Sequence, residues 1–193
     1  MLKVMLFVED LAHELFLIPL VERIAGDRSV VVNVESRSVR GGRGRMLSEL
    51  GQFLKDLESG KAVGMPDLFV VGTDANCKGQ LERQKEIEKR IPEKFREFTA
   101  YAIPDPHIER WMLVDSHAFK QQFGQGCNAP GTKCDRDRYK DQLFSQICAS
   151  GVTPQLGGME HAESIVSCLD IEHCIRNDAS FKQFVVRLRR LLA

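Results

Sequence analysis

The feature that most constrains the fold is an alternation of strand-like and helical segments over the first hundred residues. The run LKVMLFV at residues 2–8 is almost continuously apolar, which is typical of a strand covered on both faces. Further runs with strand character lie at 29–34, 68–72 and 97–103. Because helical patterns separate these runs, the sequence predicts parallel strands with helices on both faces.

The helical segments support the same plan. Asp10 can cap a helix in which apolar residues recur at helical spacing. Further helices are expected over about 47–57 and over 80–91, where Pro92 ends the second. The stretch ESRSVRGGRGRM at 35–46 is too polar and too rich in glycine for regular structure.

The chain after residue 103 is predicted to be helical, with amphipathic segments at 137–149 and 160–169. A last helix should bury one face, made of Phe181, Phe184, Val185, Leu188 and Leu191 or Leu192. The expected fold class is therefore α/β, with about four mostly parallel strands flanked by helices and a helical C-terminal extension. Residues 1–115 would form the core and 116–193 an extension packed on it, within a single domain overall.

Charge and cysteine content limit the location and the partners. Lys+Arg and Asp+Glu both number 27, so net charge gives no sign of a nucleic-acid partner. Acids interrupt the apolar N-terminus, among them Glu9 and Asp10, which excludes a membrane span there. The six cysteines form no CxxC pair, which favours reduced thiols in a cytoplasmic protein. A zinc site built from Cys127, Cys134, Cys168, His173 and Cys174 is the less favoured alternative.

Polar side chains follow every predicted strand. They are Glu9 and Asp10 after the first, Arg37, Arg40, Arg43 and Arg45 after the second, Asp74, Asn76 and Lys78 after the third, and Asp105, His107, Glu109 and then Asp115 after the fourth. An open parallel sheet binds ligands at the carboxyl ends of its strands. Clustered carboxylates repel one another unless a cation such as Mg²⁺ offsets them, and nearby arginines could hold a phosphate backbone.

Each of these residues also has a simpler interpretation. Glu9 could be the start of a capped helix, and Asp74 or Asn76 could belong to an Asx-turn. The arginines of 40–45 could form a solvated loop. His107 is better explained as a local hydrogen-bonding group than as a ligand, and Trp111 as core rather than as a base-stacking platform.

Four segments carry a resemblance to a known family: LFVEDLAHELFL, VVGTDANCKG, IPDPHIERWMLVD and NDASFKQFVVRL. The first two resemble motifs of TOPRIM domains. The last two resemble segments of the small stand-alone TOPRIM-like proteins related to the nuclease half of OLD-type (overcoming lysogenization defect) enzymes. The resemblance spans nearly the whole chain. It implies about four parallel strands, divalent-metal phosphodiester chemistry and a place in anti-phage defence beside an ATPase.

The resemblance also implies residue roles. Glu9 would be the general base or a metal ligand, Asp74 a metal ligand and Glu109 the acid of the third motif, so these three form the expected catalytic set. Asn76 replaces the second acid of the family's Asp-x-Asp motif. Its amide oxygen can still bind Mg²⁺ but brings no charge, which puts two-metal catalysis in doubt; Asp115 or Asp105 could compensate. The expected metal set for Mg²⁺ (or Mn²⁺) is Glu9, Asp74, Asn76, Glu109 and Asp115.

The leading hypothesis is a Mg²⁺-dependent TOPRIM-like nuclease that acts on DNA or RNA in anti-phage defence or repair. Its phosphate contacts would be Arg40, Arg43, Arg45 and Lys78. The alternative is a non-catalytic module with a degenerate metal site that binds nucleic acid or a partner ATPase, which Asn76 favours. A phosphatase of flavodoxin-like topology and a homo-oligomer also stay open. No GxxxxGK[ST] loop is present, which disfavours a P-loop nucleotide hydrolase.

Overall fold

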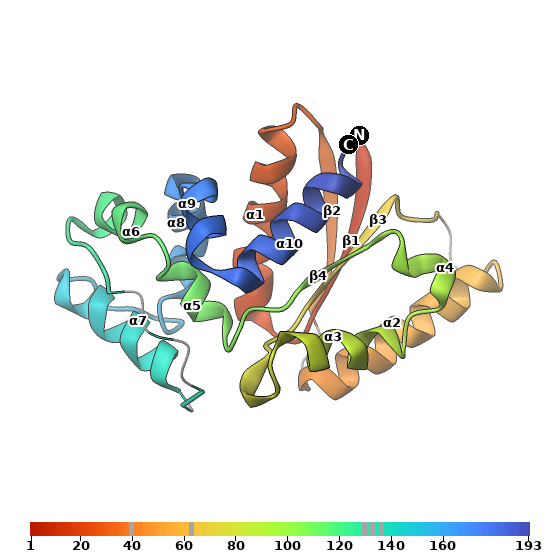
Figure 1. The fold of residues 1–193 in the computed structure, drawn as a ribbon, viewed down its shortest axis with the longest axis horizontal. Coiled ribbons are helices and arrows are strands. Elements are labelled where there is room, and N and C mark those ends of the chain that lie inside the picture. The colour runs from red at the N-terminus through yellow and green to blue at the C-terminus, as the bar shows by residue number, and fades with distance from the viewer. Residues whose placement is uncertain (39–40, 62–63, 129–130, 132–133, 136) are drawn as a thin grey trace.

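A four-stranded parallel sheet forms the centre of the protein (Figure 1), in the strand order β2-β1-β3-β4. The computed structural model describes residues 1–38, 41–61, 64–128, 131, 134–135 and 137–193. The strands are β1 (Leu2–Val8), β2 (Val32–Ser38), β3 (Leu68–Gly72) and β4 (Thr99–Ala102). The predicted α/β fold class, with a parallel sheet, flanking helices and a helical C-terminal region, is confirmed, and it is consistent with a TOPRIM-like fold.

The chain changes direction across the sheet between β1 and β3. It leaves β1 for β2 on one side and then returns to add β3 and β4 on the other. At the carboxyl ends of the two central strands, Val8 of β1 pairs with Gly72 of β3. A reversal of this kind opens a crevice beyond the strand ends, which is where open α/β sheets bind ligands.

Alternate residues of β1 pack into separate hydrophobic clusters on the two faces of the sheet. Val4, Leu6 and Val8 belong to the larger cluster, whereas Met5 and Phe7 belong to the smaller one. The helices up to β4 are α1 (Leu11–Gly26), α2 (Gly42–Glu58), α3 (Gln80–Glu88) and α4 (Glu93–Arg96). The larger cluster contains the buried face of α1 and the smaller one that of α2, so the sheet is covered on both sides (Figure 1).

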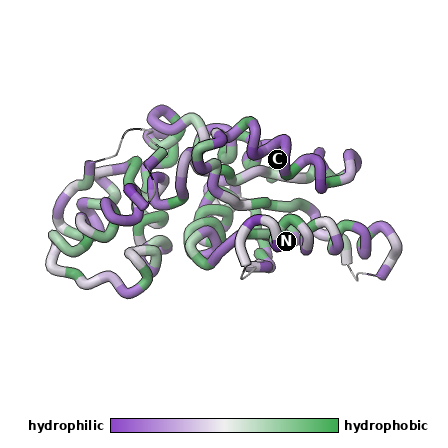
Figure 2. The backbone as a smooth tube through the Cα atoms, turned by 90° about the horizontal axis from the view of Figure 1, so that it is seen from below, coloured by the Kyte–Doolittle hydropathy of each residue, from purple (hydrophilic) through white to green (hydrophobic). Residues whose placement is uncertain are grey.

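The C-terminal region is a group of helices that shares the larger cluster with α1. These helices are α5 (Ile108–Met112), α6 (Ser116–Phe123), α7 (Arg138–Ala149), α8 (Ala162–Cys168), α9 (Ile171–Asn177) and α10 (Ala179–Leu191). The described residues also include two short 3₁₀ turns, η1 (Asn76–Lys78) and η2 (Met159–His161). Trp111 is fully buried beside Phe16, Phe181 and Phe184, so it is a core residue. Figure 2 shows hydrophobic stretches in the middle of the molecule and hydrophilic stretches on its outer turns.

The prediction of irregular structure over residues 35–46 is wrong. β2 continues through Ser38, and α2 begins at Gly42; residues 39–40 lie outside the described part of the chain. β2 is at the edge of the sheet and is only half-buried, so it accommodates polar side chains on alternate positions. α2 tolerates its early glycines because Met46, Leu50 and Leu54 give it a buried face.

No described helix combines the length and the apolar character that crossing a bilayer requires.

Candidate metal centre

Glu9 and Asp74 meet at the carboxyl ends of β1 and β3. The backbone N–H of Asp74 donates a hydrogen bond of 2.9 Å to Oε1 of Glu9, and the N–H of Glu9 donates one of 3.3 Å to the carbonyl of Gly72. The two side chains are only 13% and 12% exposed. The convergence that the sequence predicts for these two acids is therefore present.

Gly72 allows α1 to approach these strand ends. A Cβ atom at this position would lie 2.5 Å from Cδ1 of Leu17 and 3.0 Å from Cγ1 of Val8. A side chain at this position would have to displace both methyl groups, so glycine suits the close packing of Leu17 and Val8 at this strand end.

His13, in the first turn of α1, is the third member of the site. Asp10 caps the helix: its Oδ1 accepts the backbone N–H of His13 over 3.1 Å and lies 2.7 Å from Nδ1 of the same residue. The other ring nitrogen, Nε2, lies 3.2 Å from Oδ1 of Asp74 and 3.9 Å from Oε1 of Glu9. In the described part of the chain, Glu9, His13 and Asp74 form one group whose possible ligand atoms all lie within 4.8 Å of one another.

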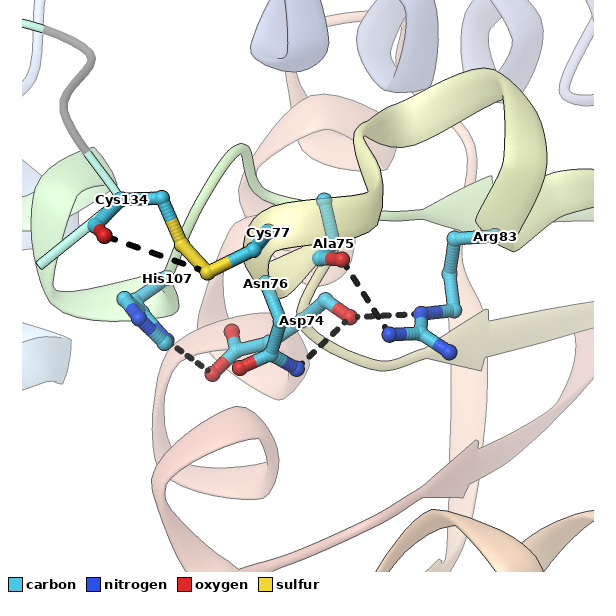
Figure 3. The surroundings of a disulfide bond; sticks show 7 residues. All are labelled: Asp74, Ala75, Asn76, Cys77, Arg83, His107 and Cys134. Carbon is cyan, nitrogen blue, oxygen red and sulfur yellow. Dashed lines mark hydrogen bonds and ion pairs between the residues drawn. A yellow bond between two sulfur atoms is a disulfide. The ribbon is translucent and has the colours of Figure 1, made fainter. Parts of the chain in front are cut away.

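The carboxylate of Asp74 also receives bonds from the start of α5. Nδ1 of His107 lies 2.9 Å from Oδ2, and the backbone N–H of Ile108 donates to Oδ1 over 2.9 Å. The interpretation of His107 as a local hydrogen-bonding group is thus confirmed. Buried Arg83 fixes the main chain beside the site by donating to the carbonyls of Asp74 and Ala75, at 3.0 and 3.2 Å (Figure 3).

The electrostatics of the site follow from these contacts. Burial alone would lower the pKa of His13, but the charge of Asp74 and the hydrogen bond with Asp10 outweigh it and raise that pKa well above 6.5. Burial alone would raise the pKa of Asp74, yet the charge of His13 and the hydrogen bond with His107 lower it to about 2. The hydrogen bond with Asp74 raises the pKa of His107. The site therefore pairs the carboxylate of Asp74 with two imidazole groups whose protonated forms it stabilises.

Glu109, on α5, is buried close to this group but outside it. Burial, and then the negative charge of Asp74, raise the pKa of its carboxyl group. Its Oε2 is buried and makes no hydrogen bond with any described residue. Buried polar atoms usually have a partner, so a carboxyl oxygen left in this way fits a bound cation.

The site opens into a hollow of about 300 Å³. One wall is formed by Glu9, Asp74, Asn76 and His107, and the other by Asp137, Tyr139 and Lys140 around the start of α7. Asn76 takes the left-handed conformation, with φ of 52°, and its amide donates to the carbonyl of Asp74 over 3.4 Å. Lys140 is exposed and supplies a cation that the sequence analysis did not identify.

Asp115 is not brought to the metal group. Its Oδ1 accepts the backbone N–H groups of His117 and Ala118 at the start of α6, and its Oδ2 accepts that of Asp170 before α9. Both oxygens thus join helices of the C-terminal region. This geometry gives Asp115 a structural role in place of the metal-binding role that the sequence analysis expects.

The predicted phosphate contacts divide into three cases. Nζ of Lys78 lies 2.7 Å from Oε1 of Glu86, and Nε of Arg43 lies 3.9 Å from Oε2 of the same residue. Nε of Arg45 is 3.4 Å from Oε1 of Glu49, along the surface of α2. Arg40 lies outside the described residues. Lys78 and Arg43 therefore meet beside the site, where Glu86 already pairs with both.

A disulfide lies next to the site (Figure 3). It joins Cys77 of η1 to Cys134, which is 57 positions further along the sequence, with a Cα–Cα distance of 5.4 Å. The prediction of reduced thiols is wrong for this pair, whereas Cys127, Cys148, Cys168 and Cys174 are free. No group of described residues that could hold a metal includes a cysteine. Disulfides persist in oxidising compartments, and the cytoplasmic location stays a prediction.

Comparisons with protein-family models, with curated proteins and with solved structures find no match for this chain. The TOPRIM resemblance therefore stays a prediction, supported by its motifs and by the fold class.

Proposed function

We propose that the protein is a divalent-metal-dependent, TOPRIM-like nuclease that cleaves phosphodiester bonds in DNA or RNA, within an anti-phage defence or repair system. The observation that carries this proposal is the convergence of Glu9 and Asp74, with His13 between them, where the strand order reverses. Carboxylates at this edge of a parallel sheet are suited to a cation that contacts a phosphate.

The ligand types favour Mn²⁺ over Mg²⁺. Mg²⁺ prefers an all-oxygen environment, whereas imidazole suits transition metals and Mn²⁺ also accepts carboxylates. The group offers two carboxylates and the imidazole of His13, and the amide of Asn76 lines the same hollow. A bound divalent ion would polarise a phosphoryl oxygen and lower the pKa of a coordinated water.

The chain's own residues would carry the remaining steps. Glu109, whose pKa is raised, keeps a proton at a higher pH than an ordinary glutamate. It could give this proton to the leaving oxygen as the phosphorus–oxygen bond breaks. Lys140 lines the hollow and could bind a phosphate. Lys78 and Arg43, which both pair with Glu86, could bind a further phosphate of the same chain.

The experiment is cleavage of plasmid and of single-stranded DNA and RNA, with Mg²⁺, with Mn²⁺ and with a chelator. Glu9→Gln and Asp74→Asn should each lower the rate by about 10²-fold or more. Glu82→Gln, which changes an acid on the exposed side of α3, is the matched control and should cleave normally. Cleavage that survives both site substitutions would exclude this mechanism.

A second candidate is the non-catalytic module that binds nucleic acid or a partner ATPase. It is favoured by His13, whose raised pKa lets an imidazolium neutralise Asp74, and by Asn76 in place of an acid. Calorimetric titration with Mn²⁺ separates the two candidates. Nucleic-acid binding with no heat of Mn²⁺ binding would favour the module over the enzyme.

A further inference from the structure

A second concave site lies at the β4 edge of the sheet, and none of the metal-centre residues lines it. The cavity has a volume of about 670 Å³. Its walls come from α3, α4, α10 and Tyr101 of β4, the last strand in the sheet order. The volume lies within the range of small-molecule sites, which is about 300–1,000 Å³.

α10 presents one complete face to this cavity. The cavity-lining residues of the helix are Ala179, Lys182, Gln183, Val186, Arg187 and Arg190. They follow each other at intervals of three and one, which places them along a single helical stripe. A different set, with Phe181, Phe184 and Leu188, is buried in the hydrophobic core. The cavity-lining residues of α10 are therefore not needed for core packing and are available to contact a ligand.

The cations of the cavity have no carboxylate partners. Lys182, Arg187 and Arg190 of α10 and Arg96 of α4 face a single acid, Glu88, which leaves a formal charge of +3 in a chain of net charge zero. None of the four forms an ion pair with a described residue. By contrast, Lys78, Arg83 and Arg189 all pair with glutamates. This local excess of positive charge favours an anionic ligand.

Two of the guanidinium groups are held in place by backbone carbonyls. Arg187 donates to the carbonyls of Thr99, Arg96 and Glu97 at 2.7–3.0 Å. Arg96 donates to those of Ile91 and Glu88, at 3.0 and 2.9 Å. Carbonyl groups fix the position of a guanidinium without cancelling its charge. An anion would therefore meet cations that are already ordered, which lowers the entropy lost on binding.

Tyr101 adds an aromatic ring and an unsatisfied hydroxyl to the site. Its oxygen is buried and makes no hydrogen bond with any described residue. Burial, and then the charge of Glu88, raise the pKa of Tyr101 to about 12, so the group stays a neutral donor. Gln84 and Gln183 line the same cavity and offer amide donors and acceptors. A ligand with a flat, polar ring system would use all three side chains.

We propose that this cavity binds a nucleoside polyphosphate. Its phosphates would contact Arg187, Arg190 and Lys182, and its nucleoside would lie against Tyr101 and Val186. The cavity is the size of a small ligand, and three uncompensated charges match a polyphosphate chain. The proposal does not depend on metal binding at the Glu9 group or on nuclease activity.

The test is calorimetry on the whole protein with ATP, GTP, AMP and inorganic tripolyphosphate, at fixed low salt and with a chelator present. We expect ATP or GTP to bind more tightly than AMP, which has fewer phosphates, and than tripolyphosphate, which has no nucleoside. The double substitution Lys182→Glu with Arg190→Glu should weaken binding by at least ~10-fold. Arg176→Glu, an exposed charge reversal on α9 outside the cavity, is the control for a single reversal and should leave binding unchanged.

Tyr101→Phe removes only the hydroxyl and should weaken nucleotide binding several-fold, with an unchanged thermal melting curve confirming that the variant is folded. Three results would overturn the proposal. They are no binding of any nucleotide to the wild-type protein, binding that the double substitution does not weaken, and tripolyphosphate binding as tightly as ATP. The last result would instead assign the cavity to polyanions in general.

Discussion

The backbone N–H of Asp74 donates a hydrogen bond of 2.9 Å to Oε1 of Glu9 and so joins the ends of β1 and β3. The two residues are 65 positions apart in sequence, and the bond crosses the point where the strand order reverses. Glu9 thus has a structural contact through one oxygen, while the charge of its carboxylate is available to a cation. The two roles can be separated by substitution.

Glu9→Gln should keep the structural contact and lose the metal. The glutamine carbonyl can still accept the N–H of Asp74, so the free energy of unfolding should change by less than about 0.5 kcal/mol. Mn²⁺ affinity should fall by ~10-fold or more because one ligand charge is removed. Glu9→Ala should lose both, with a loss of about 1 kcal/mol. Calorimetry and chemical unfolding measure the two effects, and unchanged Mn²⁺ affinity in Glu9→Gln would show that Glu9 is not a ligand.

Stability should fall in acid because of Asp74. Its pKa is lowered from 3.8 to about 2 by folding, so its stabilisation is present above pH 3.8 and is lost as the pH falls towards 2. The contribution of Asp74 to the free energy of unfolding that is lost in this range is roughly 2 kcal/mol. Urea unfolding between pH 2 and pH 5 measures it, and the same series on Asp74→Asn should show a smaller decrease. Equal pH dependence in the two proteins would contradict the assignment.

Mn²⁺ affinity should rise with pH because His13 must lose a proton to bind a metal through Nε2. The pKa of His13 is raised well above 6.5, so protons compete with the metal above neutral pH. We expect an increase of up to ~10-fold per pH unit until His13 is neutral. In His13→Gln the affinity should be weaker and nearly independent of pH over this range. A flat profile in the wild-type protein would exclude His13 as a ligand.

The sequence was sufficient to predict where Glu9 and Asp74 meet, because that prediction needs only the strand periodicity and a parallel sheet. The third strand has the predicted bounds, Leu68–Gly72. His13 was missed although its signal was present: it lies three residues after a capping Asp10 and four after Glu9, so helical geometry turns its ring towards both.

Other features could not be predicted because their partners are distant in sequence. Asp115 follows a short helix and resembles a ligand as much as a cap; its contact with Asp170, 55 positions away, distinguishes the two. The pairing of Cys77 with Cys134 spans 57 positions, and connectivity cannot be deduced from cysteine spacing alone. The start of α2 was missed because the propensity of glycine was given more weight than the buried face of the helix.

Asp115→Ala should reduce stability without affecting the metal centre. The substitution removes the cap of α6 and the bond to the backbone of Asp170, at a cost of about 1–3 kcal/mol. Mn²⁺ affinity should equal that of the wild-type protein at a temperature where the variant is folded. A thermal melt and a calorimetric titration on the same sample test both statements. Weaker Mn²⁺ binding by the folded variant would restore Asp115 to the metal set.

Reduction of the disulfide should destabilise the protein far more than it weakens metal binding. The bond closes a loop of 57 residues, for which the chain-entropy model gives ~4 kcal/mol. It fixes η1 to the segment that leads to Tyr139 and Lys140, whereas the metal group itself is held by β1, β3 and α1. Dithiothreitol, or Cys77→Ser with Cys134→Ser, should therefore lower the melting temperature by many degrees but change Mn²⁺ affinity little.

Cys148→Ser, at a free and exposed cysteine, is the control and should melt like the wild-type protein. If dithiothreitol lowers the melting temperature of the double variant as much as that of the wild-type protein, the stabilisation does not come from this disulfide.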